Sequence, residues 1–114
     1  MAYKSTPTRF YLGYVPDATT TEVYEVVDDG AILTFINFYN NNATPETIEI
    51  WVVPTGESVG DEYKISQGNL ATVSNSDLSP LKGMVLSPGD KIYIQTTTAD
   101  KVTCYLSGVI LTDV

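Results

Sequence analysis

The chain has 114 residues, with 14 acidic and 6 basic side chains, one cysteine and no histidine, and its formal net charge is −8. Without an imidazole, the chain cannot build a Ser-His-Asp triad, a Cys-His pair or a histidine-ligated metal site. A single cysteine also excludes an intramolecular disulfide and a site with several thiolate ligands. The composition therefore excludes the common hydrolase designs and favours a structural or binding protein without a cofactor.

The charge also bears on possible partners. The pI is near 4.1 and the basic residues are scattered, whereas nucleic-acid-binding proteins concentrate Lys and Arg. The N-terminus has no apolar segment of the kind found in a secretion signal, and no apolar run approaches the roughly 18 residues of a membrane span. We expect a soluble protein, made in the cytoplasm without a signal peptide, that binds neither nucleic acid nor membrane.

Apolar residues alternate with period two along most of the chain, and no window carries the spacing of an amphipathic helix. This pattern predicts an all-β protein. Strands are expected, with turn-forming residues between them, at about 9–15, 22–28, 31–39, 47–53, 62–66, 81–86, 91–97 and 102–112. About eight short strands in one domain predict a single antiparallel β-sandwich, arranged like a jelly roll.

Residues 1–21 form a mildly basic segment on an acidic chain and have two interpretations. The first is an extended arm that docks on a neighbouring subunit or another partner by adding a strand to an exposed sheet edge, with Arg9 and Tyr11 at the interface. The second is the first strand of the sandwich itself. Residues 22–114 form the β-sandwich domain under both interpretations.

The dipeptide Asp29-Gly30 lies between two apolar strands, 22–28 and 31–39. Asp-Gly in such a position is typical of a two-residue hairpin turn with positive φ at both central residues. We therefore predict a tight hairpin that pairs these two strands directly.

The strands 31–39 and 47–53 predict which side chains face the core. Antiparallel pairing points one apolar row inward: Ile32, Ile36, Phe38, Ile48, Ile50 and Val52. The opposite side, marked by Glu49, then carries an exposed cluster: Leu33, Phe35, Tyr39 and Trp51. Such a patch is typical of a subunit interface, so we predict a homo-oligomer, most simply a trimer. Alternatively, one strand has the opposite register, or the N-terminal segment covers the cluster within the subunit.

In the C-terminal half, Pro88-Gly89 predicts a turn directly before the alternating strand 91–97. The last strand, 102–112, alternates until Gly108, after which three apolar residues run together. A bulge at Gly108 would explain this change of phase.

Two weaker constellations involve acidic and amide side chains. A calcium site is conceivable at the acidic residues Asp28, Asp29, Glu57, Asp61 and Glu62, but they lack EF-hand spacing. No acid is distinguished as one of the two carboxyl groups that glycoside hydrolysis requires. Exposed aromatic rings beside the asparagines at 40–42 would suit a glycan, although such runs more often form turns.

Four turn-and-strand segments together resemble small β-sandwich virion proteins of tailed bacteriophages. They are residues 36–41 (INFYNN), 47–54 (TIEIWVVP), 86–93 (LSPGDKIY) and 102–109 (VTCYLSGV). The likeness covers about residues 30–112. It implies a non-enzymatic structural protein of the virion, of the capsid decoration or head or tail accessory type, that contacts other virion proteins such as the major capsid protein. The alternative is a carbohydrate- or receptor-binding module exposed on the virion.

Overall fold

The computed structural model describes residues 3–71, 75–76 and 82–113, and within this part of the chain β-strands predominate and no α-helix occurs. The elements are β1 (Tyr3–Tyr14), β2 (Thr21–Glu25), β3 (Gly30–Asn40), β4 (Glu46–Val53), the short 3-10 helix η1 (Asp61–Tyr63), β5 (Lys64–Leu70), β6 (Asn75–Ser76), β7 (Met84–Leu86), β8 (Lys91–Thr96) and β9 (Val102–Asp113). The predicted all-β fold is confirmed. Part of the strand predicted at 81–86 lies outside the described residues.

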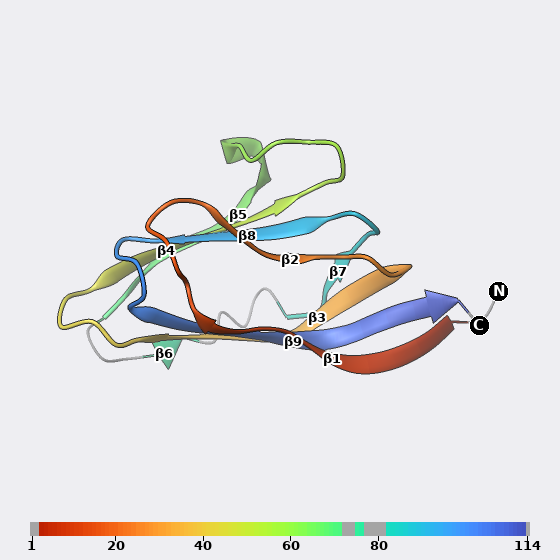
Figure 1. Ribbon diagram of the computed structural model, residues 1–114, viewed down its shortest axis with the longest axis horizontal. Helices are drawn as coiled ribbons and strands as arrows, with labels where there is room; N and C mark the ends of the chain where they lie inside the picture. The colour runs from red at the N-terminus through yellow and green to blue at the C-terminus, as the bar shows by residue number, and fades with distance from the viewer. Residues whose placement is uncertain (1–2, 72–74, 77–81, 114) are drawn as a thin grey trace.

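The strands form two antiparallel sheets that pack face to face (Figure 1). Sheet A has the order β1-β9-β3-β6, with β7 also paired to β3, and sheet B has the order β2-β8-β4-β5. Strands β1 to β4 alternate between the sheets, and β8 and β9 do so again. This order is the double Greek key of a jelly roll, so the predicted antiparallel β-sandwich is confirmed.

The hydrophobic core lies between the two sheets and is built by side chains that alternate with solvent-facing neighbours along each strand. The strands β4 and β8 follow the predicted pattern: Ile48 and Ile50 are buried, Val52 packs against the core, and Ile92 and Ile94 oppose them from β8. Apolar burial of this kind supplies the main stabilisation of a chain that has no disulfide.

The predicted hairpin at Asp29-Gly30 is wrong. Strand β2 ends in sheet B and β3 begins in sheet A, so residues 26–29 cross from one sheet to the other. The crossing is held by backbone bonds, because the Val26 N–H donates to the Asp90 carbonyl at 2.9 Å and the Asp29 N–H donates to the Leu111 carbonyl at 3.0 Å. Pairing of β2 with β8 and of β3 with β9 outweighs the local turn signal.

A one-residue bulge in β3 lies beside Gly108. Leu33 lies opposite Gly108 and Phe35 lies opposite Ser107, which leaves Thr34 without a partner position. The sequence predicts a bulge in β9 at Gly108, but β9 keeps its alternation and the extra residue lies in the neighbouring strand. The glycine marks the bulge because the β3 backbone approaches it closely.

The Thr34 bulge explains two errors in the predicted facing of β3. After the bulge, Ile36 and Phe38 point inward and are buried, as predicted. Before the bulge the phase is inverted, so Leu33 is buried in the core and Ile32 is the half-buried, outward residue. The predicted inward position of Ile32 and the predicted outward position of Leu33 are therefore wrong.

Residues 3–14 form β1, which pairs along its length with β9 of the same chain and lies at one side of sheet A (Figure 1). It contains a second bulge at the same level of the sheet. Arg9 lies opposite Ser107 and Tyr11 opposite Leu106, so Phe10 is the extra residue. Phe10 is buried and its ring stacks on that of Tyr24 in β2, at 4.2 Å between centroids.

The close approach at Gly108 gives a stability prediction. A Cβ at this position would overlap the Ile32 carbonyl oxygen and lie 3.0 Å from its carbonyl carbon, and backbone atoms cannot move aside as a side chain can. We expect Gly108→Ala to lower the free energy of unfolding by about 3 kcal/mol, measured by urea denaturation. Gly68→Ala is the control, because no atom lies within 4 Å of its added Cβ. Equal stability of the two variants would contradict the close packing at Gly108.

Candidate interaction surface

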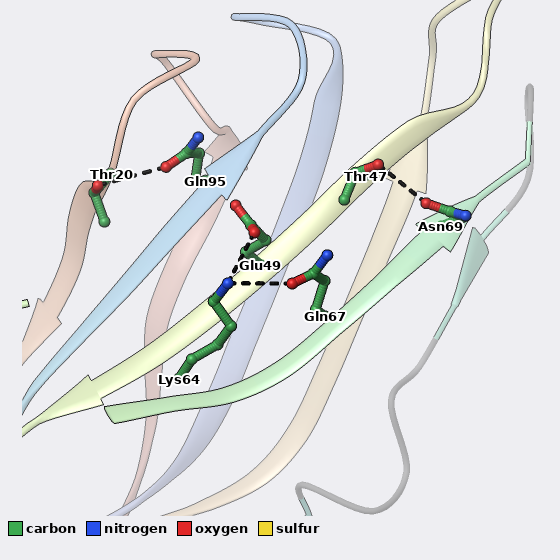
Figure 2. A network of polar contacts seen from close by, with 7 residues as sticks. All are labelled: Thr20, Thr47, Glu49, Lys64, Gln67, Asn69 and Gln95. Atoms are coloured by element: carbon green, nitrogen blue, oxygen red, sulfur yellow. Dashed lines mark hydrogen bonds and ion pairs between the residues drawn. The ribbon is translucent and has the colours of Figure 1, made fainter. Parts of the chain in front are cut away.

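The outer face of sheet B is covered by polar cross-strand contacts (Figure 2). They are Thr20 with Gln95 at 3.5 Å, Thr47 with Asn69 at 3.0 Å, and Lys64 with Glu49 at 3.0 Å and with Gln67 at 3.1 Å. A second ion pair joins Lys91 and Glu22 at 3.6 Å. Polar side chains that form hydrogen bonds and ion pairs with one another across the strands are typical of a sheet face that is exposed to water.

Trp51 lies on this polar side of β4, which confirms the prediction that it shares a side with Glu49, but it is not exposed. Only 6% of its surface is accessible. The Lys64 ammonium lies 5.3 Å from the ring centroid, Tyr93 lies directly opposite on β8, and η1 contacts β4. The predicted place of Trp51 in an exposed cluster is therefore wrong, because neighbouring side chains and the segment after β4 cover it.

The outer face of sheet A is different in character, and we call it the apolar face. Its large exposed side chains are Tyr3 (52%), Leu12 (52%), Tyr14 (48%), Phe35 (40%), Tyr39 (36%) and Val85 (72%). Ile32, Tyr105 and Val109 are half-buried between them. The face therefore carries both aliphatic and aromatic groups, from β1, β9, β3 and β7.

The strand register shows that these side chains form one continuous surface, because directly paired residues project to the same side of a sheet. They lie in cross-strand rows: Leu12–Tyr105–Asn37, Tyr14–Thr103–Tyr39 and Pro7–Val109–Ile32–Val85. A fourth row, Arg9–Ser107–Phe35, lies between the first and the third. The most central strand of the surface is β9.

Three of the six residues predicted for an interface lie on the apolar face. Phe35 and Tyr39 are exposed there, and Arg9 projects to the same side from β1. Leu33 does not reach it, since the Thr34 bulge turns it into the core.

Tyr11 also leaves the predicted interface, because the Phe10 bulge turns it inward. Its ring packs against the core, and its hydroxyl donates to the Tyr14 carbonyl. Burial, followed by the negative charges of Cys104 and Asp100 when ionised, raises the pKa of Tyr11. Arg9 and Tyr11 therefore point to opposite sides of the sheet although they have the same parity in the sequence.

Sequence reasoning missed most of the apolar face, including Leu12, Tyr14, Ile32, Val85, Tyr105 and Val109. The alternation of β9 was a usable signal, because residues with the opposite parity to Cys104 and Leu106 must leave the core. Leu12 and Tyr14 carried no such signal, since their phase depends on the bulge before them.

Charge is also distributed unequally over the molecule. The described residues in the four rows of the apolar face include the cation Arg9 and no Asp or Glu, and Lys82 lies with its ammonium 5.6 Å from the Phe35 ring. The outer face of sheet B, in contrast, carries Glu22, Glu25 and Glu49. On a chain with a net charge of −8, the four described rows of the apolar face carry no acid, whereas Asp113, opposite Tyr3, projects to the same side of sheet A at the far end of β9.

The acidic residues considered for calcium do not converge. In the part of the chain that the structure describes, no group of three or more His, Cys, Asp or Glu could hold a metal ion. The Asp29 carboxylate accepts a hydrogen bond from the Asp113 N–H at 2.6 Å, and Glu57 is hydrogen-bonded to Tyr63. These carboxylates have structural partners of their own.

The asparagine run forms a turn that closes one end of the sandwich. The buried Asn40 amide donates to the carbonyls of Thr44, Leu70 and Ala71 at 3.0 to 3.3 Å. Asn42 donates to the buried Glu46 carboxylate at 2.9 Å, and this carboxylate also accepts the Thr98 N–H at 2.9 Å. Asn40 and Asn42 thus satisfy buried groups of the fold, which leaves Asn41 as the exposed amide beside the tyrosines.

No protein-family model matches this chain, and no curated protein does either. A chain in a solved structure of infectious bursal disease virus, Gt strain, is similar over 97% of this chain, with 9% sequence identity and a TM-score of 0.27. This chain spans 30% of that viral chain. At this TM-score, the likeness carries no argument about function. The described part of the chain contains no helix suited to crossing a membrane.

The burial of Trp51 gives a second prediction. Trp51→Ala should lower the free energy of unfolding by about 3 kcal/mol or more, because it leaves a cavity beneath Lys64, whereas Tyr39→Ala on the apolar face should cost less than about 1 kcal/mol. Urea denaturation measures both. If Trp51→Ala impaired association and left stability unchanged, Trp51 would belong to an interface after all.

Cys104 gives a third prediction. Its side chain is fully buried in the core, and burial raises the pKa of its thiol far above the ordinary value. Since the thiolate is the reactive form, the folded protein should not react with a disulfide reagent at mildly alkaline pH, and the protein unfolded in urea should react with one equivalent. Rapid labelling of the folded protein would contradict the burial of this strand.

Proposed function

We propose that this protein is a non-enzymatic structural subunit that assembles through the apolar face of its β-sandwich. The observation that carries the proposal is the contrast between its two outer faces. Polar side chains pair with one another on sheet B, whereas sheet A exposes rows of aliphatic and aromatic side chains. Large contiguous apolar patches are uncommon on monomeric proteins and mark interaction surfaces.

The composition of the apolar face supports a protein partner. Tyrosine, phenylalanine and arginine are enriched in protein interfaces, and acidic residues are depleted at their centres. Phe35, Tyr39 and Arg9 provide such groups, and the aliphatic row that ends at Val85 adds surface that has no hydrogen-bonding group to offer a sugar.

The non-enzymatic part of the proposal rests on the available side chains. The chain has no histidine, and its one thiol lies in the core with a raised pKa, so it offers neither an imidazole base nor a reactive thiolate.

The proposed setting is the virion of a tailed bacteriophage, with the protein as a capsid decoration or head or tail accessory protein. Support comes from the resemblance of four turn-and-strand segments in residues 30–112 to small virion proteins of this kind. A homo-oligomer in contact with other virion proteins, such as the major capsid protein, is part of this proposal.

A carbohydrate- or receptor-binding module is the second candidate. The observation in its favour is the row in which Tyr14 and Tyr39 flank Thr103, because two exposed rings on one sheet face can stack on a saccharide. Saturable binding to an oligosaccharide that is lost in Tyr14→Ala would support this candidate.

The fourth prediction tests the virion role. In particles purified from an infected culture by density gradient, mass spectrometry should find this protein at a constant ratio to the major capsid protein. Recombinant protein with Leu12→Glu should fail to enter particles, whereas Ile65→Glu, which alters a similarly exposed side chain on sheet B, should enter them. Presence in the lysate but absence from purified particles would overturn the proposal.

A further inference from the structure

We propose that the partner on the apolar face is a second copy of this chain, packed face to face across a two-fold axis. The inference deepens the proposed function and rests on it, because it names the occupant of the same surface. Four observations support it: the size of the face, its charge, the arrangement of its rings and the interruptions in the sheet edges.

The size of the face fits a stable pair. Strand β9 has 12 residues, which at about 3.3 Å per residue gives a length of about 40 Å. With β1 and β3 beside it at about 4.8 Å spacing, the face is about 14 Å wide, and β7 widens it only along three residues. Its footprint is thus about 600 Å², so a pair would bury about 1,200 Å² in total, at the lower end of the range for stable interfaces.

The distribution of charge over the chain favours a second copy as the partner on this face. Each chain carries a net charge of −8, so two copies repel each other wherever their acidic surfaces meet. The four described cross-strand rows of the apolar face contain no acid, so contact through these rows brings no acidic side chains of the two copies together. The acid Asp113, opposite Tyr3, projects to the same side of sheet A at the far end of β9. The acids of sheet B, such as Glu22 and Glu49, would then lie on the far sides of the pair.

The centre of the face has aromatic side chains, which often contribute much of the binding free energy of an interface. Tyr105 lies on β9, and its ring meets the Phe35 ring edge to face, with 5.6 Å between centroids. The Lys82 ammonium lies 5.6 Å from the same Phe35 ring. Two aromatic rings held in fixed orientation near the middle of a surface lose little conformational entropy on binding, and such residues act as hot spots.

Three of the sheet edges, those formed by β1, β2 and β5, favour contact between faces over addition of strands. Strand β1 is interrupted by Pro7 and by the Phe10 bulge, β2 shifts register between Glu22 and Tyr24, and β5 shifts opposite Trp51. Proline and bulges at an edge hinder the pairing of a further strand. A single self-complementary face forms a closed pair by two-fold symmetry, whereas a trimer needs two different complementary surfaces.

The fifth prediction is tested by sedimentation velocity of the full chain across the micromolar range. The wild-type protein should sediment as a dimer. Leu12→Glu and Tyr39→Glu should each raise the dissociation constant by about a hundredfold or more, since each dimer would bury two unpaired carboxylates. Ile65→Glu is the matched control, because it places the same charge at a residue of similar exposure on sheet B, and it should remain dimeric.

Ionic strength provides a second readout. Screening weakens the repulsion between two chains of charge −8, so added salt should strengthen the dimer. Association that weakens with salt would point to attraction between opposite charges and would overturn the inference. The inference is also overturned by a wild-type monomer, by a trimer, or by a dimer that survives both face variants while their thermal transitions confirm folding.

The two proposals can fail separately. A wild-type monomer whose Leu12→Glu variant is excluded from particles would overturn the self-pairing and leave the virion role in place. A dimer that depends on the apolar face but is absent from purified particles would support the pairing and overturn the virion role.

Discussion

The close contact between Gly108 of β9 and the backbone of β3 determines the character of sheet A. At this level both neighbours of β9 contain one extra residue, Phe10 in β1 and Thr34 in β3. A one-residue bulge inverts the alternation of a strand. Without the bulge in β3, the phase set by its first half would send Phe35 and Tyr39 into the core. The exposure of Phe35 and Tyr39 is thus a consequence of the bulge opposite Gly108, and the outward position of Tyr14 is a consequence of the Phe10 bulge.

The end of the sandwich that carries the Tyr14–Thr103–Tyr39 row is held rigidly by buried polar groups. Asn40 follows Tyr39 directly and is bonded to three carbonyl groups, and Asn41 donates to the Thr103 hydroxyl at 3.2 Å. A satisfied polar network of this kind fixes the loops around it, and removal of one partner would leave buried groups unpaired. A surface fixed in this way before binding loses less conformational entropy when a partner docks.

Sequence reasoning succeeded where local chemistry decides the structure and failed where distant contacts do. Most of the strand positions, the aliphatic row of β4 and the turn at 87–90 follow from alternation and from a glycine with φ +86. The start of β1 at Tyr3, where the prediction was residue 9, and the two-residue β6 do not. The signal of Asp29-Gly30 was overridden because β2 and β3 pair with strands far away in the sequence. Thr34 gives no local sign of its bulge, and the covering of Trp51 depends on how residues after β4 fold back. Of the six residues predicted for an interface, three lie on the apolar face and three do not.

The interruptions of the sheet edges connect the N-terminal strand to the way in which the molecule can associate. An arm that docks by strand addition needs free, regularly spaced N–H and C=O groups. In the structure, one side of residues 3–14 is already paired with β9, and the other presents Pro7, which has no N–H, and a bulge. Backbone pairing at this edge is therefore unfavourable, while the side chains of the same strand, Leu12 and Tyr14, are exposed on the apolar face. Strand β1 contributes to association through the side chains it presents, and the Phe10 bulge that interrupts its edge is also the feature that points them outward.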